Sequence, residues 1–123
     1  MVRIVGAFQR AAEGLFDRLP SGASITRRRN AFQNRAEGST LWRQASGKGY
    51  DDLLCAVEIT DLLRFFQQRH LLAHCEGMVD RDYINRSWDQ VYSVGQRLVI
   101  REDAVSHAAD VASRLVNELR KLV

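Results

Sequence analysis

The sequence has few prolines, cysteines and lysines, and it contains no long apolar run. Its 123 residues include one proline and two cysteines, and only two of its 18 basic residues are lysines. Because no run reaches about 18 apolar residues, no transmembrane helix is expected. The apolar stretch at the N-terminus is too short for a signal peptide, and a charged residue follows it at once. These absences predict a cytoplasmic protein without a membrane partner.

The two cysteines do not form a disulfide framework. Cys55 and Cys75 both lie in the segment that we predict below as one long helix. A rise of roughly 1.5 Å per residue would separate them by about 30 Å. They could not then bond within one chain, and we expect a reducing cytosol.

Helical periodicity dominates the rest of the chain. Apolar side chains recur at spacings of three and four in four segments, which are 2–19, 24–38, 50–75 and 102–122. Pro20 follows the first segment, and Gly77 is well placed to end the third. Four helices with short connections predict an antiparallel bundle.

The connections carry weaker signals. Residues 38–50 resemble a loop, with one helical turn around Trp42, and residues 78–100 have the polarity of an irregular segment that ends in an extended stretch. We therefore predict a single all-α domain over residues 1–123. It is an antiparallel bundle of four to five helices with a long third helix and an irregular segment before the last one. Met1 leads almost directly into a helix, which is compatible with a piece of a longer protein.

Positive charge is concentrated in one part of the chain. The net charge is +3, but the stretch from Ser21 to Lys48 alone carries six basic residues and one acidic residue, a local charge of +5. These basic residues are Arg27, Arg28, Arg29, Arg35, Arg43 and Lys48. Arginine is the better bidentate phosphate ligand, which favours a nucleic-acid partner. An arginine-rich composition on a solvated face explains the same pattern.

The predicted helix 50–75 is apolar on two sides. One stripe contains Tyr50, Leu53, Leu54, Val57, Phe65 and Leu72. The second follows Ala56, Ile59, Leu63 and Phe66, and the same spacing continues to His70 and His74. A helix that is apolar on two sides packs against two surfaces. These are either two helices of its own bundle, or one bundle face and a partner chain.

The segment Arg69-His70-Leu71-Leu72-Ala73-His74 places one cation and two titratable rings near the end of this helix. Three interpretations remain open. The histidines stabilise the helix C-terminus, where the dipole favours positive charge. They bind a metal, since the i, i+4 spacing suits zinc and Cys75 is adjacent, although the HExxH pattern is absent. Or Arg69 and the histidines act on a phosphate, with histidine transferring protons and arginine stabilising negative charge.

This segment resembles the R-x4-H motif of HEPN-domain ribonucleases, in which a polar residue, here His70, directly follows the arginine. The continuation through Gly77, Met78, Val79, Asp80 and Tyr83 is similar to HEPN sequences as well. The resemblance covers about half of the chain, from Tyr50 to the C-terminus. A second pair, Arg101 and His107, has R-x5-H spacing, starts a predicted helix and lacks the flanking pattern.

The resemblance implies a metal-independent endoribonuclease without a cofactor. Two R-x4-H motifs would form one composite site in a homodimer, with Arg69 on the scissile phosphate, His74 as acid or base and His70 in support. The dimer contact would use Ile59, Leu63, Phe66 and Ala73, and the six basic residues would guide RNA. Products would carry 2′,3′-cyclic phosphate and 5′-hydroxyl ends.

The family occurs in toxin–antitoxin pairs, phage defence and RNA processing, so an antitoxin or an effector-complex protein is a further expected partner. Glu76 stands where the toxins paired with nucleotidyltransferase antitoxins usually have tyrosine, which argues against regulation by AMPylation. Two alternatives stay open. The chain is a catalytically silent HEPN-like module for dimerisation and for partner, nucleotide or RNA binding, or it is an accessory subunit that binds RNA through the arginine-rich stretch alone.

Overall fold

The computed structural model describes all 123 residues, and its regular elements are helices. They are α1 (Val2–Asp17), the 3-10 helix η1 (Ala31–Gln33), α2 (Arg35–Ser46), α3 (Tyr50–Leu53), α4 (Ala56–His74), α5 (Arg81–Ser87) and α6 (Glu102–Arg120). The only β pairing is an isolated bridge between Met78 and Arg97. The predicted all-α class is confirmed. None of the helices is both long and apolar enough to cross a membrane.

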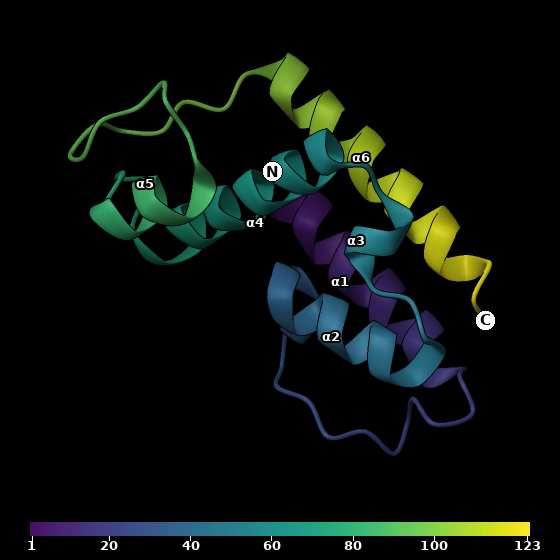
Figure 1. Cartoon of the computed structure of the whole chain (residues 1–123). Helices are drawn as coiled ribbons and strands as arrows, with labels where there is room; N and C mark the ends of the chain where they lie inside the picture. The colour runs from purple at the N-terminus through teal and green to yellow at the C-terminus, as the bar shows by residue number, and fades with distance from the viewer.

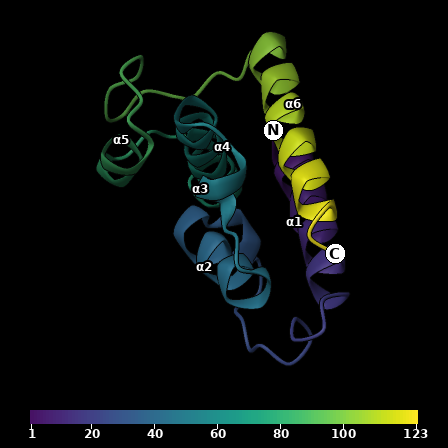
Figure 2. The same ribbon diagram turned by 45° about the vertical axis from the view of Figure 1, so that its right-hand side comes forward.

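Helices α1 and α6 lie side by side and run in the same direction (Figures 1 and 2). Both carry apolar residues at spacings of three and four, which gives each helix one face to bury. The buried residues of these faces are Val5, Phe8, Ala12, Leu15 and Phe16 on α1, and Ala108, Val111, Leu115 and Leu119 on α6. They form the main core together with residues of α2, α3 and α4.

The second helix lies further along the chain than the sequence predicts. Residues 24–30 form an irregular connection that contains turns and a bend, and the helix spans Arg35–Ser46. Asn34 caps its start, since the side chain accepts a hydrogen bond from the Glu37 amide at 3.1 Å. The predicted single turn around Trp42 is therefore wrong. Trp42 is fully buried against Phe16 and Phe32, and this burial stabilises a helix whose own polarity is that of a loop.

The predicted helix 50–75 is two helices. The backbone of Leu54 is extended, and Cys55 caps the start of α4. The Cys55 amide donates to Glu58 Oε1 at 3.1 Å, which gives α4 its own N-terminal cap. Because Tyr50 is anchored in the core, where its hydroxyl donates to the Phe32 carbonyl at 2.9 Å, α3 keeps a separate position. Cys55 and Cys75 are both free thiols.

Helix α5 lies inside the segment that the sequence predicts to be irregular. Asp80 caps it by accepting a hydrogen bond from the Tyr83 amide at 2.8 Å. Buried Tyr83 belongs to a second, smaller core with Leu71, Val79 and Leu98. This core holds α5 against α4, on the side of the molecule away from α1 and α6 (Figures 1 and 2). The extended residues predicted at 98–100 form no strand, although the Leu98 amide donates to the Gly77 carbonyl at 2.7 Å.

Candidate functional site

Arg69, His70 and His74 lie on the last two turns of α4. The helix stops directly afterwards, because Glu76 and Gly77 have φ angles of 54° and 77°. The Gly77 amide donates back to the Leu71 carbonyl at 3.0 Å, as in the common glycine stop of helices. Both histidine side chains are exposed, and their ring centroids are 5.0 Å apart. The motif therefore presents two neighbouring imidazoles to solvent.

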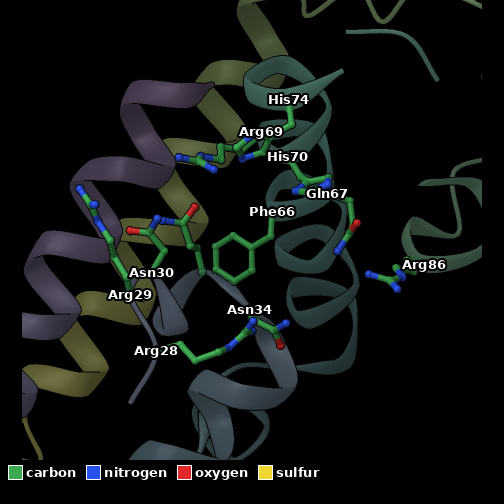
Figure 3. Close-up of a pocket in the computed structure, with 11 residues that line it drawn as sticks. Arg28, Arg29, Asn30, Asn34, Phe66, Gln67, Arg69, His70, His74 and Arg86 are labelled. Atoms are coloured by element: carbon green, nitrogen blue, oxygen red, sulfur yellow. The ribbon is translucent and has the colours of Figure 1, made fainter. Parts of the chain in front are cut away.

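These three residues line one pocket of about 320 Å³ together with residues from two other parts of the chain (Figure 3). The connection between α1 and α2 contributes Arg28, Arg29, Asn30, Gln33 and Asn34, α4 adds Phe66 and Gln67, and α5 supplies Arg86. We call this the arginine pocket. Its lining contains four arginines, two histidines and four side-chain amides, and no carboxylate.

Most of the positive charge in the arginine pocket is unpaired. Arg29, Arg69 and Arg86 form no ion pair and no side-chain hydrogen bond, and the buried Nε of Arg69 has no partner. Arg28 differs, because its Nε donates to both Glu37 oxygens at 2.9 and 3.1 Å. These hydrogen bonds lower the pKa of the Glu37 carboxyl below its ordinary value. Unpaired guanidinium groups around one cavity favour the binding of an anion with several oxygen atoms.

Asp61, an acid earlier on the same helix, does not neutralise Arg69. Its carboxylate lies 2.8 Å from His107 Nε2 and 3.7 Å from Arg64. His107 belongs to the R-x5-H pair, and its ring contacts Phe65 edge-on at a centroid distance of 5.7 Å. His107 is thus part of a contact between α4 and α6 outside the arginine pocket.

Only two of the six basic residues predicted to bind RNA reach the pocket, namely Arg28 and Arg29. Arg35 pairs with Asp51 at 3.1 Å, and Arg43 pairs with Asp52 at 3.2 Å. Lys48 is exposed on the connection between α2 and α3. Nearby carboxylates pair with four of the six basic residues, namely Arg27, Arg28, Arg35 and Arg43. RNA binding by the residues outside the pocket stays a prediction.

Arg27 has a structural role. It lies 2.5 Å from Asp17 and 3.5 Å from Glu13, and its guanidinium covers the rings of Phe16 and Phe32. Its side chain is only 14% exposed. Arg27 therefore anchors the connection after α1 to that helix and lies outside the arginine pocket, and its contact with RNA stays a prediction.

The predicted dimer contact is only partly available on the surface. Phe66 is buried in its own chain, where its ring lies 5.6 Å from that of Phe8, and Ile59 packs against the same core. Leu63 is half-buried and Ala73 is exposed. Phe66 of the second apolar stripe is thus part of the core beside α1, and half-buried Ile59 packs against that core, while a dimer contact through Leu63 and Ala73 stays a prediction.

Sequence analysis missed Arg86, Gln67 and Asn30 as pocket residues. Arg86 lies in a stretch whose polarity predicts a loop, so no signal placed it beside α4. Asn30 has a left-handed backbone with a φ angle of 62°, which asparagine tolerates better than most residues. The position of Asn30 directly before a helical turn was the one sequence signal that pointed to this backbone conformation.

The residues after the motif that resemble HEPN sequences also have structural roles. Gly77 ends α4, Asp80 starts α5, and Val79 and Tyr83 fill the small second core. The Tyr83 hydroxyl donates to buried Asp89 at 2.5 Å and accepts from Gln68 at 3.3 Å. Burial, and then the hydrogen bond to Asp89, raise the pKa of Tyr83 well above its ordinary value. This segment holds α5, and with it Arg86, against the end of α4.

No further side chain joins His70, His74 and Cys75 as a possible metal ligand. No group of three or more histidine, cysteine, aspartate or glutamate residues is placed to hold a metal ion. The Cys75 thiol lies 4.0 Å from Asp80, the cap of α5.

The function of the arginine pocket is therefore argued from its lining residues alone. In comparisons with known proteins, no family model, no curated protein and no solved structure matches the chain.

Proposed function

We propose that this chain is a HEPN-type, metal-independent endoribonuclease with a HEPN-like helical bundle, and that it acts as a homodimer. The observation that carries the proposal is the presence of Arg69, His70 and His74 in one pocket with three further arginines and no carboxylate. RNA is the ligand class because a phosphodiester supplies the anion, and its 2′-hydroxyl supplies an internal nucleophile.

The reaction uses only groups of the pocket and the RNA. One histidine accepts the proton of the 2′-hydroxyl, whose oxygen forms a bond to the adjacent phosphorus. The bond from phosphorus to the 5′-oxygen breaks, and a second histidine protonates that oxygen. Arg69 donates hydrogen bonds to the phosphate oxygens as negative charge develops on them. The products are a 2′,3′-cyclic phosphate and a 5′-hydroxyl.

The dimer brings a second copy of the motif to the same site. Ala73 and His74 are both exposed at the end of α4, so this end is free to approach a second copy. His74 of each chain then serves as acid or base, and His70 supports its neighbour from 5.0 Å between ring centroids. A toxin–antitoxin, phage-defence or RNA-processing setting fits this activity.

The decisive experiment is an RNA cleavage assay in excess EDTA. Wild type should cleave and leave cyclic phosphate ends. His74→Ala should lose about 10²–10⁴-fold in rate, and Arg69→Ala about 10²–10³-fold. Circular dichroism and light scattering check that each variant folds and dimerises. Equal cleavage by all three proteins would contradict the proposal.

A second candidate is a catalytically silent HEPN-like module that binds RNA. It is favoured by one observation, because neither His70 nor His74 has a hydrogen-bond partner that would orient its ring. In that case wild type binds RNA without cleaving it, and His74→Ala changes binding only slightly. Measuring binding and cleavage on the same RNA separates the two candidates.

A further inference from the structure

The arginine pocket has two positively charged ends. Arg29, beside Asn30, comes from the connection before η1, whereas Arg86 comes from α5. In Figure 3 these two arginines lie on opposite sides of Phe66, and Gln67 extends toward Arg86. Each end thus combines one exposed, unpaired guanidinium with one side-chain amide.

The motif lies between these ends. Arg69, His70 and His74 come from α4, which separates the connection before η1 from α5 in the pocket lining. Because Arg29 and Arg86 lie on opposite sides of Phe66 (Figure 3), the three unpaired arginines favour a ligand with anionic groups at more than one position along its length.

We propose that each arginine pocket is a binding track for a single RNA strand, with Arg29 and Arg86 holding the phosphates on either side of the one at Arg69. This inference rests on the proposed function, since it takes RNA as the ligand. It narrows the substrate class to single-stranded oligonucleotides with at least three successive phosphates. A dinucleotide fills only the centre of the track.

The side-chain amides support a strand over a simple anion. Asparagine and glutamine bind phosphate and sugar oxygens as well as base edges. Asn30 and Gln67 have no side-chain partner within the protein, so their amides are free to bind these groups. A volume of about 320 Å³ is also at the lower end of pockets that enclose small organic ligands, rather than a bare ion.

The test measures binding without cleavage. The probes are fluorescein-labelled 2′-O-methyl oligouridylates with one phosphate between the nucleosides or with three. They lack the nucleophilic hydroxyl, so binding can be measured whether or not the chain cuts RNA. The variants are Arg29→Gln and Arg86→Gln. The matched control is Arg81→Gln, because Arg81 is also exposed on α5 and unpaired but does not line the pocket.

Wild type should bind the three-phosphate probe at least about tenfold more tightly than the one-phosphate probe, the equivalent of one good charged contact. Arg29→Gln and Arg86→Gln should each remove most of this advantage and reduce the salt dependence of the longer probe by about one phosphate contact. Arg81→Gln should keep both. A longer probe can also bind in more than one alignment, which raises its apparent affinity. This effect is the same for every variant and cancels when the variants are compared with wild type.

Two results would overturn the track. One is an equal affinity of wild type for both probes, and the other is an advantage that survives in Arg29→Gln and Arg86→Gln. If wild type cleaves ordinary RNA while either result is obtained, the ribonuclease proposal stands and the track is wrong. If no cleavage occurs but the advantage depends on Arg29 and Arg86, the track stands and the catalytic proposal fails.

Discussion

His107 Nε2 on α6 lies 2.8 Å from Asp61 Oδ2 on α4. This contact joins two helices through residues that are 46 positions apart in sequence, and it gives the Asp61 carboxylate a partner other than Arg69. It also separates the two Arg/His pairs of the chain into different roles. His107 links two helices, whereas Arg69 and His74 line the arginine pocket.

The first prediction concerns this division of roles. His107→Ala should leave the rate of RNA cleavage unchanged, in contrast to His74→Ala. Because the His107 side chain is 56% exposed, the lost contact with Asp61 should lower the free energy of unfolding by only about 0.2–1 kcal/mol. Urea denaturation and the cleavage assay check the two parts. A folded His107→Ala protein without cleavage would place His107 in the site.

The second prediction concerns the small core behind α5. Tyr83→Phe removes the hydroxyl that donates to Asp89, which is 8% exposed. The carboxylate then keeps only its bond from the Val91 amide, and the free energy of unfolding should fall by about 1–3 kcal/mol. Tyr92→Phe is the control, since the Tyr92 hydroxyl binds Val99 in a more exposed place, and it should cost less. Equal losses of unfolding free energy in the two variants would show that the buried hydrogen bond to Asp89 contributes no more than the exposed one.

The third prediction concerns acid stability. The hydrogen bond from the Cys55 amide lowers the pKa of Glu58 below its ordinary value of 4.5. The ionised carboxylate therefore stabilises the folded chain fully above pH 4.5, and this contribution disappears as the pH falls through the lower pKa of the folded state. Glu58→Gln keeps an acceptor for the Cys55 amide but cannot titrate. Its stability should fall less than that of wild type when the pH is lowered from neutral through this range. Parallel stability curves for the two proteins in urea would contradict the assignment.

The fourth prediction compares two glycines. Gly77 has a left-handed φ angle of 77°, so Gly77→Ala should destabilise the chain by about 1–2 kcal/mol although a Cβ atom has space there. Gly14 lies in α1, and no atom lies within 4 Å of the position that an added Cβ would take, so Gly14→Ala should stabilise by about 0.5–1 kcal/mol. Thermal unfolding of both variants measures the difference. Equal shifts of the melting temperature would mean that the end of α4 does not depend on the glycine conformation.

The strongest helical patterns in the sequence identify the right helices. The spacing of Leu15 and Phe16 in α1 and of Leu115 and Leu119 in α6 predicts buried faces, and both helices end within two residues of the predicted positions. Such patterns are reliable because each helix buries one continuous face, whatever neighbour it meets. The position of Arg69, His70 and His74 at the end of a helix follows from the same periodicity, together with Gly77 as the stop.

The weaker patterns fail where tertiary contacts override local preference. Residues 35–46 contain Gly38, Ser39 and Thr40, which do not favour a helix, yet burial of Trp42 makes them helical. The break at Leu54 is equally invisible to periodicity, because apolar spacing continues across it. Local sequence cannot report the anchoring of Tyr50 in a distant part of the core.

The motif and its helix are therefore properties of the sequence by itself, since i, i+4 spacing on a helix puts His70 and His74 on one face. The surroundings of the motif are properties of the tertiary structure alone. Packing of α5 on α4 brings Arg86 to the pocket, and the connection after α1 brings Arg29, while carboxylates pair with Arg27, Arg35 and Arg43. Which arginines stay unpaired depends on through-space distances between segments far apart in the chain, and no local pattern contains them.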